Sequence, residues 1–224
     1  MRKYLKIFTI LISGLFTTAV KAEPIKIGPA ELSFNAGYMS QYIWRGQDQN
    51  DNSGSPYFGA DLALPYDLYF GTWTASADGT GYSQEIDLYA GIAPSFGPLS
   101  LDLGYIEYRY PGAREESNFG EFYGIISIAP EGMPVSFSAS YYEEDQDTAG
   151  VSEYVDYSIS FDTGKGVTLG ALYGDYDTNN KFWQATADAS YGGLDFTLAY
   201  IDNDMDDAAS EDKEFVTLTI GKSF

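Results

Sequence analysis

Acidic side chains are the groups in this sequence best suited to chemistry, because its 224 residues include 33 Asp and Glu but no His and no Cys. Adjacent glutamates at Glu115–Glu116 and Glu143–Glu144 could form acid–base pairs. Such a pair needs a sheltered pocket that separates the two pKa values, and both pairs fall in polar segments that we predict to be exposed loops. A serine–histidine relay is impossible without His. We therefore predict no enzyme, no catalytic residue and no cofactor.

The run "DNDMDD" is the closest approach to a metal-binding motif. Asp202, Asp204 and Asp206 have the spacing of the first three ligands of an EF-hand. Asp207 occupies the position that requires Gly, and Lys213 stands where the bidentate Glu belongs. We predict a solvated acidic loop and assign no metal site. A weak divalent contact that bridges to lipopolysaccharide phosphates stays open as the alternative.

A second acidic set recurs at every other position of alternating segments, opposite apolar residues. The set comprises Asp61, Glu85, Asp87, Asp102, Glu121, Asp156, Asp162, Asp188 and Asp195, and Arg45 is the one basic residue that we place with it. If these side chains line the lumen of a barrel, they attract cations and exclude anions. The alternative is a lumen packed with side chains that does not conduct.

The elements that must position these acids are β-strands. We predict strands over 31–45, 56–64, 68–76, 83–94, 99–110, 119–129, 135–142, 152–162, 166–176, 181–191, 194–203 and 213–224, from period-two alternation bounded by turn signals. Short Pro, Gly and Asp connections mostly alternate with longer polar ones, as in outer-membrane barrels. The fold class is therefore all-β: an antiparallel, up-and-down transmembrane barrel of 12 strands.

Two further predictions concern single positions of this barrel. The first strand, extended to Arg45, points that guanidinium into the lumen, where Asp61 on the neighbouring strand is the partner we expect. The alternation of apolar residues breaks between Tyr105 and Ile106, which predicts a β-bulge there and leaves the side that Arg109 faces open.

Alternation alone also fits a soluble two-sheet sandwich. Three features favour the membrane barrel: a signal peptide, aromatic residues gathered near strand ends, and the aromatic Phe224 on the last strand. We predict Phe224 to be an assembly signal, and pairing of the last strand with the first would remove both sheet edges. The aromatic residues predicted to form interfacial girdles are Tyr38, Tyr42, Trp44, Tyr66, Tyr69, Tyr105, Tyr108, Tyr110, Tyr141, Tyr142, Tyr173, Tyr176, Tyr191 and Tyr200.

Residues 1–22 have the composition of a signal peptide. Basic Arg2, Lys3 and Lys6 precede the short apolar run "IFTILISGLF", and Ala22 ends a small-residue cleavage site. The apolar run is too short for a spanning helix. Cleavage would leave a single barrel domain, 23–224, and the net charge of −21 for the whole chain argues against a nucleic-acid partner.

The stretch "NAGYMSQYIWRGQDQNDNSGSPYFGADL" resembles the first hairpin of the TorF-like porin family, the Gcw_chp group of conserved hypothetical outer-membrane proteins. The pattern N-x-G-x-x-S-x-Y-x-x-R-G, followed by a Pro, is matched by Asn35, Gly37, Ser40, Tyr42, Arg45, Gly46 and Pro56. The likeness extends over the mature chain, although Ala77 replaces an Asn that is usual in the family. It implies a porin-like architecture and names no solute.

From these observations we predict a monomeric channel in the outer membrane of a Gram-negative bacterium. It would pass small ions or polar solutes and prefer cations, with Arg45, Asp61, Glu85, Asp87, Asp102, Glu121, Asp156, Asp188 and Asp195 lining the pore. Its expected partners are outer-membrane lipid, lipopolysaccharide and the barrel assembly machinery. The alternative is a non-conducting structural or surface-interaction barrel with a plugged lumen.

Overall fold

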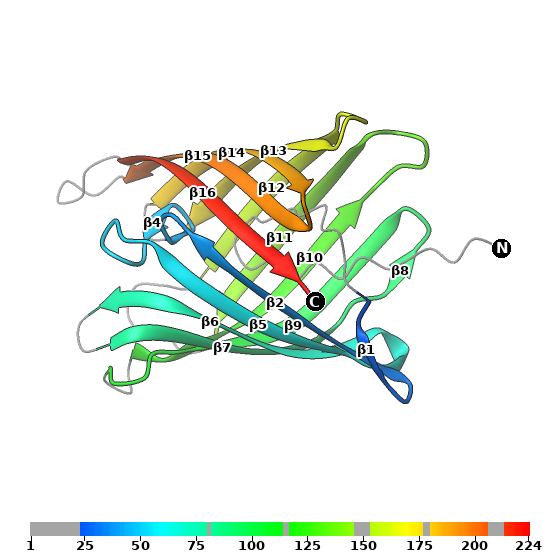
Figure 1. The fold of residues 1–224 in the computed structure, drawn as a ribbon, viewed down its shortest axis with the longest axis horizontal. Coiled ribbons are helices and arrows are strands. Elements are labelled where there is room, and N and C mark those ends of the chain that lie inside the picture. Colours follow the sequence, from blue (N-terminus) through cyan, green and yellow to red (C-terminus); the bar gives the residue numbers. More distant parts are fainter. Residues whose placement is uncertain (1–22, 80–81, 114–116, 146–152, 177–179, 206–212) are drawn as a thin grey trace.

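Twelve long antiparallel strands form the wall of the molecule in a computed structural model, which describes residues 23–79, 82–113, 117–145, 153–176, 180–205 and 213–224 (Figure 1). The strands are β2 (Ala30–Met39), β5 (Ser55–Ala63), β6 (Leu68–Gly79), β7 (Tyr82–Ile92), β9 (Leu99–Arg109), β10 (Phe119–Ile128), β11 (Val135–Glu144), β12 (Glu153–Asp162), β13 (Val167–Tyr176), β14 (Asn180–Tyr191), β15 (Leu194–Met205) and β16 (Lys213–Ser223). The predicted fold class is confirmed. Strands β6, β11 and β15 extend beyond their expected ends, and the first strand ends early.

The barrel closes where β16 pairs with β2. Pairing runs from Thr219 opposite Met39 to Ser223 opposite Asn35. Beyond β16, the backbone of Phe224 exchanges hydrogen bonds of 2.8 and 3.1 Å with Phe34. Because β2 and β16 pair with each other, neither strand is a free edge and the sheet is closed. A sandwich of two separate sheets is therefore excluded. The role of Phe224 as an assembly signal stays a prediction.

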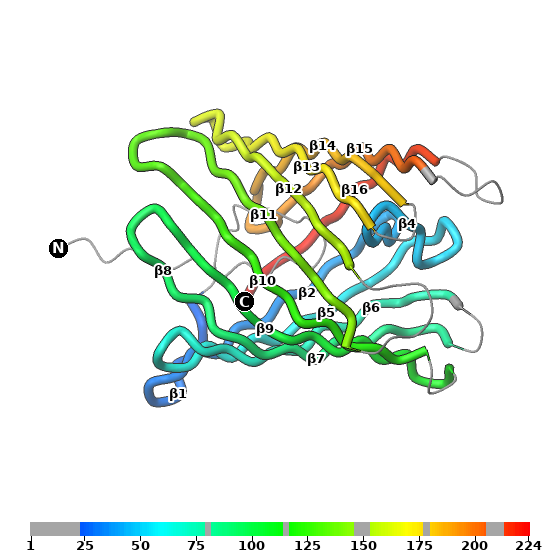
Figure 2. Tube along the Cα trace, turned by 180° about the vertical axis from the view of Figure 1, so that it is seen from behind, coloured from blue at the N-terminus to red at the C-terminus, as the bar shows by residue number. Residues whose placement is uncertain are grey.

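Several short elements lie outside the twelve wall strands. They are β1 (Ile25–Ile27) against β2, β8 (Ser95–Phe96) against β9, the one-turn helix η1 (Pro65–Asp67), and a hairpin of β3 (Ile43–Trp44) and β4 (Gln47–Asp48). Short turns gather at one end of the barrel, and the hairpin lies toward the other (Figure 2). None of the helices in the described ranges is long and apolar enough to cross a membrane.

The two faces of the wall differ in composition. Large apolar side chains point outward and stay exposed, among them Phe58, Phe70, Leu103, Phe122, Phe137, Phe161, Leu169, Leu198 and Leu218. Alternate residues of the same strands point inward, where carboxylates and tyrosines are buried. An apolar outer band and a polar interior suit a wall that is surrounded by lipid.

The prediction that the first strand continues to Arg45 is wrong. Strand β2 ends at Met39, and Ser40 closes it by donating its N–H to Leu218 and accepting the N–H of Leu218 at its Oγ, both at 2.8 Å. Residues 40–54 then leave the wall. Arg45 (φ 47°) and Gly46 (φ 78°) turn the chain through the left-handed region, which reverses its direction and forms the hairpin.

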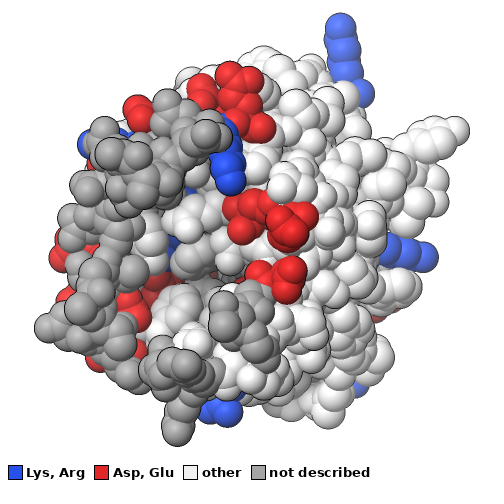
Figure 3. Space-filling view, turned by 90° about the vertical axis from the view of Figure 1, so that its left-hand side faces the viewer, with Lys and Arg blue, Asp and Glu red and all other residues white. Residues whose placement is uncertain are grey.

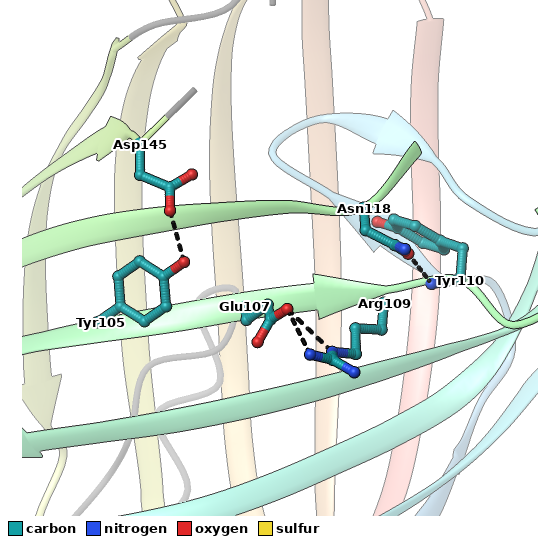
Figure 4. A network of polar contacts seen from close by, with 6 residues as sticks. All are labelled: Tyr105, Glu107, Arg109, Tyr110, Asn118 and Asp145. Atoms are coloured by element: carbon teal, nitrogen blue, oxygen red, sulfur yellow. Dashed lines mark hydrogen bonds and ion pairs between the residues drawn. The ribbon is translucent and has the colours of Figure 1, made fainter. Parts of the chain in front are cut away.

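The predicted β-bulge in β9 is also wrong. Pairing of β9 with β10 runs residue by residue from Phe119 opposite Tyr108 to Ile128 opposite Leu99, without a shift. The alternation breaks in the sequence because Ile106 and Tyr108 are apolar or aromatic residues that face the interior, where both are buried. Arg109 consequently points outward, where it pairs with Glu107 at 2.7 Å (Figure 4).

Only part of the predicted aromatic girdle lies on the outside. Exposed tyrosines include Tyr38, Tyr66, Tyr141, Tyr173 and Tyr191, whereas Tyr42, Tyr69, Tyr108, Tyr142 and Tyr176 are buried in the interior. The two groups alternate along the strands, as in Tyr141 and Tyr142 of β11. Tyrosine suits both places because its ring is apolar and its hydroxyl finds a partner. Residue type alone therefore could not assign the side.

Candidate functional site

The inward hairpin is the main feature of the interior, and its own residues fold it. The Asp48 carboxylate accepts the backbone N–H groups of Asn50 (3.0 Å) and Asn52 (2.6 Å), which tightens the segment after β4. Asp51 and Asn52 adopt positive φ angles of 46° and 56°, a conformation that Asp and Asn tolerate. The segment thus carries Arg45 on a compact tip.

Arg45 forms a buried ion pair with Glu121 of β10. Its Nη1 lies 2.6 Å from Oε1 and its Nη2 lies 2.8 Å from Oε2, a two-point contact between guanidinium and carboxylate. Both side chains are buried, with relative exposures of 4% and 2%. Tyr108 donates a further hydrogen bond of 3.1 Å to Glu121. The prediction that Asp61 is the partner of Arg45 is therefore wrong.

Aromatic rings surround the same guanidinium. Its Cζ lies 4.1 Å from the ring centroid of Tyr154, 4.3 Å from Trp44, 4.8 Å from Tyr142 and 5.3 Å from Tyr176. Ring faces attract cations at these distances. Burial by itself lowers the pKa of Arg45, but the charge of Glu121, the hydrogen bonds to Glu121 and the neighbouring tyrosines together raise that pKa above its ordinary value, so the guanidinium keeps its charge.

Two asparagines hold the backbone of the hairpin tip from the other side. Asn180 of β14 donates from Nδ2 to the carbonyl of Arg45 at 2.9 Å, and Asn203 of β15 donates to the carbonyl of Gly46 at 2.6 Å. Both amide side chains are buried. Because Glu121 belongs to β10 and the asparagines to β14 and β15, the tip bridges separate parts of the wall.

Tyr42 attaches the base of the hairpin to a third part of the wall. Its hydroxyl donates to Glu85 of β7 at 2.7 Å, and its ring lies 5.6 Å from the ring of Trp73. Burial, followed by the nearby charge of Glu85, raises the pKa of Tyr42 well above its ordinary value. The hydroxyl therefore remains a hydrogen-bond donor.

Hydroxyl groups hold most of the other predicted carboxylates. Asp61 accepts from Tyr89 (2.6 Å), Asp102 from Tyr69 (2.6 Å), Asp156 from Ser140 (3.1 Å), Asp188 from Thr197 (2.6 Å) and Thr186 (3.2 Å), and Asp195 from Ser190 (2.5 Å). These partners are neutral and stabilise a carboxylate without cancelling its charge. All five acids lie on the inner face with Glu85, Asp87 and Glu121; their role in lining a conducting pore stays a prediction.

Asp87 differs from its neighbours. Its side chain has a relative exposure of 0%, and neither carboxylate oxygen has a hydrogen-bond partner among the described residues. It lies on β7 between Trp73 of β6 and Tyr108 of β9, two residues from Glu85. Asp162, by contrast, is exposed at the end of β12, where it accepts the N–H of Gly164 in a turn.

The aromatic and amide partners of the hairpin were missed by the sequence analysis. Tyr142, Tyr154 and Tyr176 share the inward parity of their strands, as Tyr154 does with the correctly placed Asp156. Strict use of period two would therefore have moved Tyr142 and Tyr176 from the girdle to the interior and would have placed Tyr154 beside them. No comparable signal identifies Asn180 and Asn203, since their role depends on the position of the hairpin.

A cavity of about 50 Å³ remains beside the hairpin. Its lining includes Arg45, Asp102, Tyr123, Asp156 and Gln184. A volume of this size and polarity accommodates a few ordered waters. This cavity thus has a mixed aromatic and acidic lining.

Acidic groups are also prominent on the end face of the barrel shown in Figure 3. Of the EF-hand-like run, Asp206 and Asp207 lie outside the described residues, as do Glu115 and Glu116. Within the described ranges, no group of three or more acidic side chains is placed to hold a metal ion. Asp202 instead accepts a hydrogen bond of 3.0 Å from the indole of Trp183.

Comparison with known proteins gives one family and several related folds. The family model described as "Bacterial protein of unknown function (Gcw_chp)" matches residues 22–224. A search of curated proteins finds no match. Solved structures with a similar fold include a KdgM porin (TM-score 0.62, 9% identity, 86% of this chain and 98% of that one) and a NanC porin (TM-score 0.53, 9% identity, 85% and 97%).

A second KdgM porin structure, in complex with disordered oligogalacturonate, has a TM-score of 0.60 and 10% identity, covering 87% of this chain and 99% of that one. Identities this low carry information on the fold alone. They confirm the twelve-stranded closed barrel, and the chain spans nearly the whole length of these porins.

Proposed function

Because the chain belongs to the Gcw_chp family of bacterial proteins of unknown function and folds as a barrel similar to porins, we propose that it is a channel of the bacterial outer membrane. It passes small solutes through a lumen that the hairpin narrows, and it prefers cations. The observation that carries the preference is the excess of inner-face carboxylates over a single buried basic side chain, Arg45, in the described chain.

The charge balance inside the barrel supports this selectivity. Within the described residues, Arg45 forms its ion pair with Glu121, whereas inner acids such as Asp61 and Asp188 accept hydrogen bonds from neutral hydroxyls and Asp87 has no hydrogen-bond partner. Fixed negative charge in a narrow, low-dielectric passage concentrates cations and repels anions. One similar barrel was solved with oligogalacturonate, a polyanion. The acidic interior of this chain disfavours such a solute.

Conductance across a planar lipid bilayer tests the proposal. In a salt gradient of KCl, the reversal potential should lie on the side of the K⁺ equilibrium potential. Replacement of Asp188 by Asn should move it toward zero, whereas the exposed surface change Lys165→Gln should not. An anion-selective current, or a reversal potential that none of the inner-face substitutions moves, contradicts cation preference.

The hairpin supports a second candidate function, a barrel that is closed and serves a structural or surface role. Glu121, Asn180, Asn203 and Glu85 hold the hairpin from separate parts of the wall. A closed barrel conducts little as isolated and conducts strongly once Arg45→Ala is combined with Asn180→Ala and Asn203→Ala, because the hairpin tip then loses both its ion pair and its backbone contacts. A wild type that conducts steadily excludes this candidate.

Cell fractionation tests the proposed location. The protein should enter the outer-membrane fraction and show a folded band whose gel mobility changes on heating. Its expected partners there are lipid, lipopolysaccharide and the assembly machinery. Recovery of the folded protein in the periplasmic fraction would contradict both location and partners.

A further inference from the structure

The groups that hold the Arg45 guanidinium come almost entirely from the barrel wall. Glu121, Tyr142, Tyr154 and Tyr176 belong to the consecutive strands β10, β11, β12 and β13, and we call these four residues the guanidinium cage. Only Trp44 accompanies Arg45 on the hairpin. The wall therefore presents a two-oxygen acceptor and three aromatic rings that do not depend on the hairpin being present.

We propose that the guanidinium cage is a binding site for solutes that carry a guanidinium group, and that Arg45 occupies it as an internal competitor. The proposal deepens the channel function and rests on it only for the path by which a solute arrives. Binding to the cage itself does not require conduction.

The shape of the cage favours guanidinium over other cations. The two oxygens of Glu121 accept parallel hydrogen bonds of 2.6 and 2.8 Å, which a planar fork satisfies and a compact ammonium does not. Tyr108 fixes one of these oxygens through its own hydrogen bond. A planar cation at this position also lies over the rings of Tyr154 and Tyr142, whose centroids are 4.1 and 4.8 Å from Cζ, and both rings attract it.

The tethering of Arg45 determines how strongly it competes. A group on a short connected segment acts at an effective concentration on the order of millimolar. Asn180 and Asn203 strengthen this competition because they hold the hairpin backbone in place. The same contacts do not involve the Arg45 side chain. The variant Arg45→Ala therefore keeps the hairpin docked and leaves the cage empty.

N-ethylguanidinium is the matched probe, because it replaces the atoms that Arg45→Ala removes. Calorimetric titration of the folded barrel in detergent should show saturable binding to Arg45→Ala. Binding to the wild type should be about 100-fold weaker, since Arg45 must first be displaced. Bound probe should also raise the temperature at which the variant loses its folded gel band.

Two controls separate the cage from nonspecific binding. N-ethylurea has the same shape without the charge and should not bind, and the double variant Arg45→Ala, Glu121→Gln should lose binding of N-ethylguanidinium. The proposal is overturned if N-ethylurea binds equally, if the double variant binds as well as the single one, or if wild type and Arg45→Ala bind the probe alike.

A second variant tests the proposal even if Arg45→Ala does not fold. Arg45→Lys keeps a positive charge but loses the planar fork, so the probe should displace it at a lower concentration than it displaces Arg45. Equal displacement from both proteins overturns the proposal. These measurements need no membrane, so absence of conductance would contradict the channel function and leave a positive binding result intact.

Discussion

Two parts of the inner wall bury carboxylates in different ways. On β10–β13, Glu121 forms an ion pair with the Arg45 guanidinium, which aromatic rings surround. On β14–β16, which we call the hydroxyl wall, the partners that the described residues give to Asp188 are the hydroxyls of Thr186 and Thr197, and small Thr side chains continue along β16. The first arrangement cancels charge and fixes the hairpin. The second keeps charge inside the barrel and uses little volume.

This difference assigns separate roles to acids that look alike in the sequence. A carboxylate with a charged partner becomes structural, and its removal leaves a buried cation without compensation. A carboxylate with hydroxyl partners contributes to the field of the lumen and tolerates an amide in its place. Asp87 belongs to neither class, because the described chain gives it no hydrogen-bond partner.

The largest effect is expected at the guanidinium cage. Glu121→Gln should lower the free energy of unfolding by about 3–5 kcal/mol, because Arg45 then stays buried without a counter-charge. Heat or denaturant titration of the folded gel band measures this loss. Single-channel conductance should rise in the same variant, since the hairpin loses its strongest contact.

The pair of Arg109 and Glu107 is a matched control on the outer face. Its side chains are 53% and 33% exposed, and its distance of 2.7 Å resembles that of the buried pair. Glu107→Gln should lower the free energy of unfolding by about 1 kcal/mol or less, as for exposed ion pairs generally. Similar losses from Glu121→Gln and Glu107→Gln would contradict a special role for the cage.

Asp87→Asn should have the next largest effect, with the opposite sign. The amide removes a buried charge that lacks hydrogen-bond partners, so the free energy of unfolding should increase by about 1–3 kcal/mol. The same denaturant titration measures it. If Asp87→Asn destabilises the barrel, the carboxylate has a partner that the described residues do not supply.

Asp188→Asn should have a small effect on stability, about 1 kcal/mol, because its amide oxygen still accepts from Thr197. Its reversal potential in a salt gradient should nevertheless move toward zero, because one fixed negative charge is lost from the lumen. A large loss of stability with no change in selectivity would place Asp188 in the structural class with Glu121.

The smallest effect should come from one ring of the cage. Tyr176 has the most distant centroid, at 5.3 Å from the guanidinium. Tyr176→Leu keeps an apolar side chain and removes the ring. The lost cation–π attraction should lower the free energy of unfolding by about 0.5–1 kcal/mol. Tyr154→Leu, at 4.1 Å, should cost more. The reverse order in thermal unfolding would show that packing, and not the guanidinium, sets these losses.

Local alternation in the sequence was enough to predict the strands and, for most residues, the face of the wall on which they lie. Period-two alternation is a local property, so the turns and eleven of the predicted strands agree with those in the structure within a few residues. The inward positions of Asp87, Asp156 and Asp188 followed from the same rule. The same rule was not applied to the tyrosines, and residue type could not show which face they occupy, because tyrosine is stable both beside lipid and inside the barrel.

The contacts across the interior could not be predicted from the sequence, because they form between distant segments of the closed barrel. Arg45 and Glu121 lie 76 positions apart, and Arg45 and Asn180 lie 135 apart. Alternation tells which side of the wall a side chain faces, but it contains nothing about which residue stands opposite. Whether 40–54 continued the wall or folded inward depended on partners supplied by β7, β10, β14 and β15, and those partners come together only when the barrel closes.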